Sequence, residues 1–280
     1  MKIIVLGSGT SHGIPVPGCC CRVCSSEDPP DKRMRSSVYI EGAGGQRLLI
    51  DAGPEFRLQA LRAGIRGLDG VFLSHAHADH IHGLDDLRPL SQNGPVPIYG
   101  NERTIAEMTE RFSYVFGKTW GAAQRGGGKP KLSALIADGP VRMDGLTLTP
   151  VPVKHGVLDI LGWEVNEEGG KSFLYLTDTS AIPSSSMNQL KTGSKKTKRI
   201  IVIGGLRMRP HETHFSFEQA METALGLGAQ QIYLTHICHE HSHAEIEEIC
   251  RLFMAKRRAA AGGLEGIIIH PARDGLEITL

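Results

Sequence analysis

The sequence predicts an α/β protein in which two β-sheets pack together and are covered by helices. Short β-rich segments recur along the chain, and segments with helical periodicity and recognisable ends fall between some of them. The strands come in groups early and late, whereas strict alternation with helices would favour one doubly wound parallel sheet. At 280 residues the chain could fill two average domains, but layered α/β folds reach this size as one unit, so we expect a single domain over 1–280.

The predicted strands are apolar or β-branched runs bounded by turn residues. In chain order they are Lys2–Leu6, Ser37–Ile40, Arg47–Asp51, Gly70–Ser74, Leu146–Val153, Phe173–Thr177, Arg199–Ile203, Gln231–Thr235, Gly266–Ile269 and Leu276–Leu280.

Three segments show helical periodicity: 54–63, 217–227 and 243–256. The first has Pro54 in its first turn and stops at Gly64, as helix boundaries often do. The other two each follow a predicted capping box, formed by Ser216 with Gln219 and by Ser242 with Glu245.

Two segments rich in Gly, Lys and Arg interrupt this pattern, Gly121–Lys131 and Lys191–Arg199. The first follows an aromatic stretch, so 112–131 is a candidate lid or arm over a site; a plain surface loop explains it equally well. The second is interpreted as a solvated loop that leads into a strand.

Composition excludes some classes of function. Lys and Arg number 31 against 30 Asp and Glu, so no global field recruits nucleic acid or an anionic membrane. The apolar run at the start of the chain is only four residues long before Gly7, too short for a membrane span or a signal-peptide core. We therefore expect a cytoplasmic protein without a membrane partner, whose six cysteines are thiols.

The strongest signal is the run His75-Ala76-His77-Ala78-Asp79-His80, which follows an apolar strand. His75 and His77 are two residues apart and point the same way at the strand end, and after a turn Asp79 and His80 can face a second ion. Three imidazoles and a carboxylate this close together are costly to desolvate without a cation. The run predicts a metal site, and its ligand types suit Zn, Mn or Fe.

Further candidate ligands close three strands downstream. His155, Asp178 and His236 each follow a β-rich run. Taken singly, each reads as a structural polar residue; taken together, they complete two coordination spheres.

This pattern resembles the metallo-β-lactamase superfamily over nearly the whole chain. The resemblance implies a four-layer αββα sandwich with two divalent metal ions. It implies that Asp178 bridges the two ions and that Asp51 orients a ligand from behind. It also implies one metal on His75, His77 and His155, and the other on Asp79, His80 and His236.

Four of the cysteines crowd into residues 19–24, which is metal spacing rather than a disulfide framework. Cys-x-Cys-x-x-Cys offers three thiolates to a tetrahedral zinc that needs one more ligand. Together with the opening segment Gly7–Pro15, this resembles the PhnP family of phosphoribosyl cyclic phosphodiesterases. That family's structural zinc implies Cys19, Cys21, Cys24 and His239 as ligands here, with Cys20 as an extra; Cys250 and Cys238 are interpreted as packing residues.

The segment Gly204–Ser216 follows a predicted strand and leads into a capped helix. His214 occupies the place where PhnP-like and tRNase Z-like enzymes carry a His that assists the leaving group, which is work for a group titrating near 7. A capping or hydrogen-bonding role is the alternative. Arg207 and His211 are candidates for phosphate contact, and Asp79 is expected to act in catalysis as well as in metal binding. His12 is read as a loop-stabilising residue.

The favoured function is hydrolysis of a small cyclic phosphodiester, phosphoribosyl 1,2-cyclic phosphate or a 2′,3′-cyclic nucleotide, by a hydroxide between two metals. A tRNA 3′-processing nuclease is the nearest enzyme alternative, disfavoured by the near-zero net charge and the zinc cluster. Lactone or thioester hydrolysis ranks third. A non-catalytic binding protein resembling PqqB, which shares the Cys-x-Cys-x-x-Cys motif, is the alternative of another class. The complete set of seven active-site ligands favours an enzyme over it. A homodimer is left open.

Overall fold

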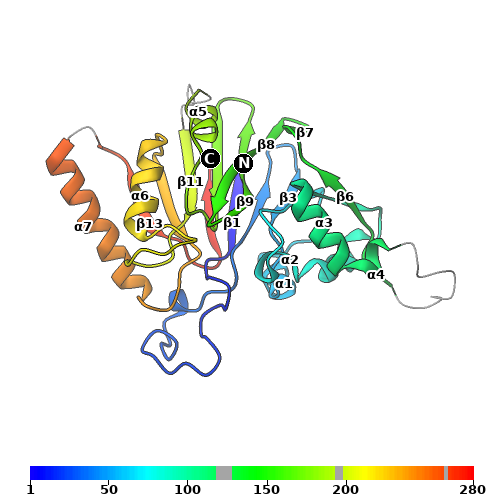
Figure 1. Cartoon of the computed structure of the whole chain (residues 1–280), viewed down its shortest axis with the longest axis horizontal. Coiled ribbons are helices and arrows are strands. Elements are labelled where there is room, and N and C mark those ends of the chain that lie inside the picture. The colour runs from blue at the N-terminus through cyan, green and yellow to red at the C-terminus, as the bar shows by residue number, and fades with distance from the viewer. Residues whose placement is uncertain (118–127, 193–197, 262–263) are drawn as a thin grey trace.

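The computed structural model describes residues 1–117, 128–192, 198–261 and 264–280. Within these residues the strands form two seven-stranded sheets (Figure 1). The first has the order β14-β1-β2-β3-β4-β5-β6, and the second has the order β13-β12-β11-β10-β9-β8-β7. Both sheets are mixed, because neighbouring strands pair antiparallel in some places and parallel in others.

The first sheet contains β1 (Lys2–Gly7), β2 (Ser37–Glu41), β3 (Arg47–Ile50), β4 (Gly70–Phe72), β5 (Val96–Gly100), β6 (Leu132–Ile136) and β14 (Leu276–Thr279). The second contains β7 (Val141–Met143), β8 (Leu146–His155), β9 (Leu158–Glu167), β10 (Lys171–Leu176), β11 (Lys198–Gly204), β12 (Gln231–Thr235) and β13 (Ile268–Pro271).

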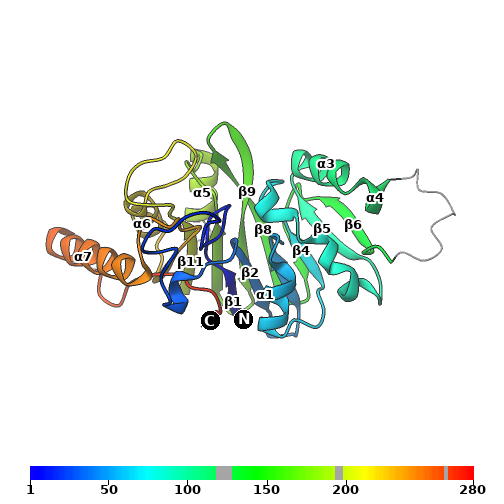
Figure 2. The ribbon, with the colours of Figure 1, turned by 90° about the horizontal axis from the view of Figure 1, so that it is seen from below.

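Helices cover the outer face of each sheet (Figures 1 and 2). Those beside the first sheet are α1 (Phe56–Ala63), α2 (Ala78–Ile81), α3 (Glu102–Arg111), α4 (Ser113–Phe116) and the 3₁₀ segment Leu84–Ser91. Those beside the second are α5 (Ser184–Thr192), α6 (Phe217–Gly226) and α7 (His243–Ala261); a further 3₁₀ turn covers Pro29–Asp31.

Three apolar layers hold the four-layer sandwich together. The central layer joins the two sheets and includes Ile3, Leu48, Trp163 and Val202, all of them buried. The other two layers lie between each sheet and its own helices. Burial of these three layers supplies the hydrophobic free energy that offsets the entropy of ordering so many strands. The expected αββα architecture is confirmed.

The predicted helix ends are confirmed by their hydrogen bonds. Ser216 and Gln219 form a complete capping box, and the Ser242 and Glu245 side chains each bond the other's backbone N–H. Gly64 ends α1 in the left-handed conformation, with φ of 67°.

Several elements were not predicted. They are β5, β6, β7 and β9 and the helices α2 to α5. Strand β9 pairs with β8 over its whole length, and a tight turn at Gly156 joins the two strands. Pairing with β8, rather than a pattern in its own sequence, therefore makes this segment a strand. Residues 118–127 of the candidate arm and 193–197 of the second basic segment lie outside the described residues.

Candidate metal centre

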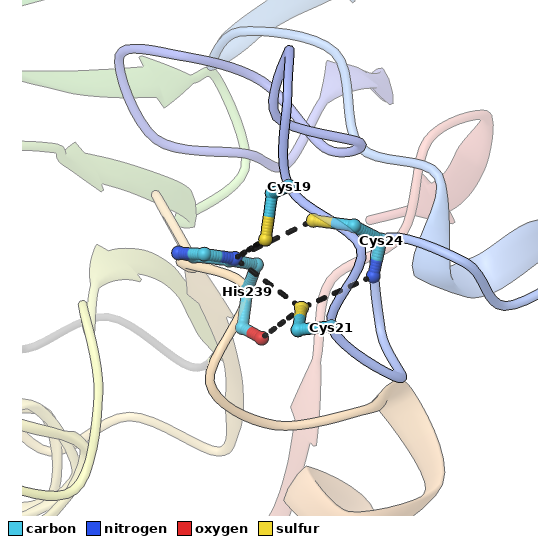
Figure 3. A group of neighbouring side chains, drawn as sticks. All are labelled: Cys19, Cys21, Cys24 and His239. Carbon is cyan, nitrogen blue, oxygen red and sulfur yellow. Dashed lines mark hydrogen bonds between the residues drawn. The ribbon is translucent and has the colours of Figure 1, made fainter.

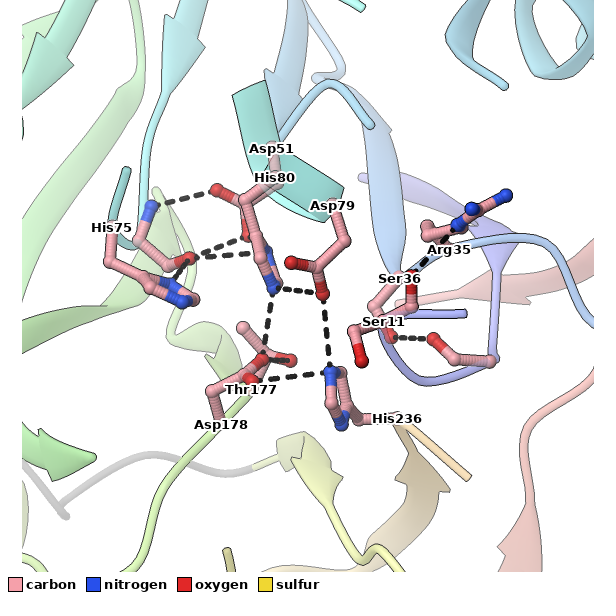
Figure 4. A network of polar contacts seen from close by, with 12 residues as sticks. Ser11, Arg35, Ser36, Asp51, His75, Asp79, His80, Thr177, Asp178 and His236 are labelled. Carbon is pink, nitrogen blue, oxygen red and sulfur yellow. Dashed lines mark hydrogen bonds and ion pairs between the residues drawn. The ribbon is translucent and has the colours of Figure 1, made fainter. Parts of the chain in front are cut away.

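Three polar residues that end strands adopt left-handed backbone conformations. Asp51 follows β3, Asp178 follows β10 and His236 follows β12, with φ of 61°, 52° and 56°. Such conformations cost free energy in residues other than glycine and gather at functional sites. Here they turn the chain sharply at the strand ends, and Asp51 and Asp178 contact His80 from opposite sides (Figure 4).

The first ligand set consists of His75, His77 and His155, whose ligand nitrogens all lie within 4.8 Å of one another. The ring of His75 lies 4.4 Å from that of His77 and 5.4 Å from that of His155, measured between centroids. The end of β8 therefore brings His155 to the two histidines beyond β4, across the gap between the sheets.

The second ligand set consists of Asp79, His80, Asp178 and His236, again within 4.8 Å. His80 Nε2 lies 3.1 Å from Asp79 Oδ2 and 3.2 Å from Asp178 Oδ2, and His236 Nε2 lies 3.1 Å from Asp178 Oδ1 (Figure 4). All four residues are buried. The seven residues predicted as ligands thus form two adjacent groups, as the family resemblance implied.

Burial and charge fit a pair of cations. The Nε2 atoms of His75, His80 and His236 are buried and form no hydrogen bond within the described residues. Burial lowers the pKa of His75, so its imidazole is neutral and free to bind a metal. Burial acts to raise the pKa of Asp79, but the neighbouring His80 and His236 outweigh it and lower this pKa, so the carboxylate stays ionised. Imidazole nitrogens beside ionised carboxylates are a donor set for Zn, Mn or Fe.

Asp51 lies behind this centre and fixes His80. Its Oδ2 lies 2.8 Å from His80 Nδ1, while its Oδ1 accepts a 2.7 Å hydrogen bond from the backbone N–H of Ser74. The Ser74 hydroxyl also donates to Asp51 Oδ2 over 2.7 Å. Asp51 therefore orients His80 so that Nε2 faces Asp79 and Asp178, the role that the family resemblance implied for it.

His214 lies between the two ligand sets. Its ring is 4.7 Å from that of His155 and 4.8 Å from that of His236, and its Nδ1 lies 3.6 Å from Asp178 Oδ1. Burial, and then the charge of His236, lower its pKa to about 3. The place of His214 agrees with the predicted catalytic role, but its lowered pKa departs from the expectation of a group titrating near 7, because burial and His236 outweigh the attraction of the Asp178 carboxylate.

The two predicted phosphate contacts differ. His211 is exposed, its ring lies 5.2 Å from that of His214, and its Nδ1 lies 3.2 Å from the Thr213 hydroxyl. Arg207 instead pairs with Glu240, at 3.1 Å between Nη1 and Oε1, and Glu240 also binds Arg209. His211 thus lies at the rim of the site, whereas Arg207 shares the single carboxylate of Glu240 with Arg209.

Cys19, Cys21, Cys24 and His239 form a separate sulfur-rich cluster (Figure 3). His239 Nδ1 is 3.4 Å from the sulfur atoms of Cys19, Cys21 and Cys24 alike. All cysteines are free thiols, and Cys20 is exposed and outside the cluster. The four predicted ligands are brought together, and three thiols with one imidazole fit a structural zinc.

The sequence analysis missed the residues that support the ligands. Ser74, Thr177 and Thr235 each come directly before a ligand, and all three are buried. The Thr177 hydroxyl donates to Asp178 Oδ2 over 2.7 Å, and the Ser74 hydroxyl lies 3.0 Å from His75 Nδ1. The sequence did contain a signal for these residues, because a Ser or Thr directly precedes a ligand at three strand ends.

Comparison with known proteins agrees with this geometry. Residues 46–237 match the profile of the "Beta-lactamase superfamily domain". A crystal structure described as a new diphosphatase from the PhnP family is 37% identical, covers 99% of this chain and 96% of its own, and superposes with a TM-score of 0.80. The chain belongs to the PhnP family of the metallo-β-lactamase superfamily. It is a metal-dependent hydrolase by fold and by ligand set.

Two curated relatives carry other names. An octanoyltransferase from Porphyromonas gingivalis is 38% identical over 96% of this chain, which spans about half (52%) of that protein's length. A ribonuclease Z from Mycobacterium sp. strain KMS is 28% identical, over 74% of this chain and 79% of its own. Among the described residues, no helix has the length and apolar character that a membrane span requires.

Proposed function

We propose that this PhnP-family chain is a phosphodiesterase for small substrates, with cyclic phosphodiesters such as phosphoribosyl 1,2-cyclic phosphate or 2′,3′-cyclic nucleotides as the first candidates. The observation that carries the proposal is the position of His214 beside Asp178, between two adjacent ligand sets. A group that assists a leaving oxygen belongs at this place.

Two divalent ions, Zn, Mn or Fe, would supply a hydroxide at neutral pH and clamp the phosphoryl oxygens. The chain's own residues do the rest. Asp178 and Asp79 stay ionised and hold the charge of the centre, and Asp51 keeps His80 in a single orientation. His214, neutral at pH 7, donates a hydrogen bond to the departing oxygen, and His211 contacts the substrate at the rim.

The substrate class is supported by the name of the structural relative. That protein is described as a diphosphatase, and a diphosphate and a phosphodiester share a phosphoryl centre that bears a negative charge. The structural zinc, held by Cys19, Cys21, Cys24 and His239, contributes folding energy rather than chemistry in this proposal.

A panel of substrates tests the proposal. Purified protein supplied with Zn or Mn is assayed on phosphoribosyl 1,2-cyclic phosphate, 2′,3′-cyclic nucleotides, a linear diester, a nucleoside diphosphate and an octanoyl thioester. We expect the highest kcat/KM on a cyclic diester and loss of all turnover in Asp178→Ala. The exposed Asp138→Asn serves as the matched control. The highest rate on the thioester would overturn the proposal.

A second candidate is tRNA 3′-processing, favoured by the ribonuclease Z relatives. The net charge of +1 gives it little support, because RNA binding draws on an excess of basic residues. Cleavage of a precursor tRNA at rates above those on the cyclic diesters would favour this alternative. A PqqB-like binding role would instead show metal uptake without turnover of any substrate.

A further inference from the structure

A pocket of about 270 Å³ lies apart from both metal sites. Four segments that are distant in sequence form its walls: Ile14, residues 29–34, the end of α1, and the turn between β13 and β14. The lining includes Pro29, Pro30, Lys32, Arg62, Arg273 and Asp274, and none of these residues belongs to a ligand set.

The side chains of this pocket carry an excess of positive charge. Lys32 and Arg273 are exposed and form no ion pair among the described residues. Arg62 donates a 2.9 Å hydrogen bond to the Leu6 carbonyl and lies 3.6 Å from Asp274, so one carboxylate faces three cations. Arg33 also borders the pocket, but its buried guanidinium is already paired with Asp31.

Asp274 makes the wall of the pocket rigid. Its side chain is 6% exposed, and it accepts hydrogen bonds from the Ser8 N–H at 2.9 Å, the Ser8 hydroxyl at 2.8 Å and the Met34 N–H at 2.8 Å. These bonds fix the loop after β1 and the residue after Arg33. The backbone that forms this wall is therefore fixed before any ligand arrives, which lowers the ordering entropy that opposes binding.

We propose that this pocket binds a small phosphate-bearing anion, with inorganic phosphate or a sugar phosphate as the ligand class. Arginine side chains present paired N–H donors that match phosphate oxygens, and lysine adds a point charge. The volume suits one phosphate with a small substituent and is below that of pockets for drug-sized ligands. This inference does not rest on the proposed function.

The pocket is connected to the metal centre by a short path. The Ser8 carbonyl accepts a 3.0 Å hydrogen bond from the N–H of Ile237, and Ile237 directly follows the ligand His236. An anion held by Arg62 and Arg273 would share Arg62 with Asp274, whose carboxylate holds Ser8.

The test is a calorimetric titration of the metal-loaded protein with inorganic phosphate. The pocket variant is Lys32→Gln with Arg273→Gln. The matched control, Arg142→Gln with Lys256→Gln, removes the same charge from exposed positions outside the pocket. We expect wild type and control to bind one more phosphate than the pocket variant, or to bind it at least tenfold more tightly.

Phosphate bound at the catalytic metals is common to all three proteins, so the difference between them reports the pocket alone. Equal stoichiometry and affinity in the pocket variant and the control would overturn the inference. If the protein hydrolyses none of the phosphodiesters in the substrate panel, the difference in phosphate binding between the pocket variant and the control is still expected. Melting temperatures without phosphate show whether the pocket variant is folded; if it is not, Arg273→Lys, which keeps the charge but loses the paired donors, should still weaken binding.

Discussion

His236 and His239 are three residues apart, and they face two different sites. His236 Nε2 lies 3.1 Å from Asp178 Oδ1 in the metal centre, whereas His239 Nδ1 lies 3.4 Å from the sulfur of Cys21. The segment between them is fixed by hydrogen bonds, from Ile237 N–H to the Ser8 carbonyl at 3.0 Å and from Thr10 N–H to the Ile237 carbonyl at 3.2 Å. One short rigid segment therefore supports both the sulfur-rich cluster and the catalytic centre.

We predict that the purified protein binds about three metal ions per chain, because two adjacent ligand sets and the sulfur-rich cluster are distinct. The two ions of the catalytic centre should exchange readily, whereas the ion of the closed cysteine site should be held tightly. Elemental analysis before and after brief chelation measures this. A single ion after expression with added metal would contradict the prediction.

The sulfur-rich cluster should contribute to folding. We predict that Cys21→Ser or His239→Ala loses the tightly held zinc and destabilises the fold by about 3 kcal/mol or more, which corresponds to roughly 10 °C in Tm. Zinc content and thermal unfolding are measured in parallel. Cys20→Ser is the matched control, since that thiol is exposed and outside the cluster. A Cys21→Ser protein with unchanged zinc and Tm would show that the cluster has been misread.

Asp51 should tune metal affinity rather than chemistry. In Asp51→Asn the side chain keeps its size but loses the charge that faces His80 Nδ1 at 2.8 Å. We predict that affinity at the Asp79, His80 and His236 set falls by about 10- to 100-fold, the usual cost of losing such a partner. Competition with a chelator measures it, with Asp138→Asn for comparison. Activity should recover at high metal concentration, and a permanent loss would contradict the positioning role.

The active-site ligands could be predicted from sequence because they end strands. His155 ends a partly alternating strand and His236 follows a short strand that is buried on both faces, so their place at the end of a strand follows from the sequence pattern alone. Which strand ends meet could not be derived in this way, because the meeting of β4 with β8 depends on how two sheets pack. The family resemblance supplied that step.

Other features escaped sequence reasoning for physical reasons. Strand β6 has two exposed apolar residues, Leu135 at 40% and Ile136 at 49%, so its pattern lacks a buried face. Arg207 forms an ion pair with Glu240, which lies 33 positions away, so no local sequence pattern indicates this contact. The low pKa of His214 arises from burial among other histidines, which only the folded arrangement shows.

Two predictions concern His214, and the first separates a role in catalysis from a role in binding. If this residue donates a hydrogen bond to the leaving oxygen, His214→Ala should keep its metals and lose about 10²- to 10³-fold in kcat on alkyl or ribosyl diesters. The loss should be far smaller on p-nitrophenyl diesters, whose leaving group departs without a proton. Equal losses on both substrates would place His214 among groups that stabilise the charge of the transition state. No loss on either would leave it a structural residue at the start of α6.

The pH profile distinguishes the two protonation states of the same residue. Because the pKa of His214 is lowered to about 3, its ring is neutral at every pH above that value and does not titrate between pH 5 and 8. The ratio of wild-type to His214→Ala activity on alkyl diesters should therefore stay constant across this range. If an imidazolium were the working form, the wild-type advantage would be largest at low pH and would fall as the pH rises through its pKa. A tenfold decline of the ratio between pH 5 and 8 would show that bound substrate and metals restore a pKa near 7.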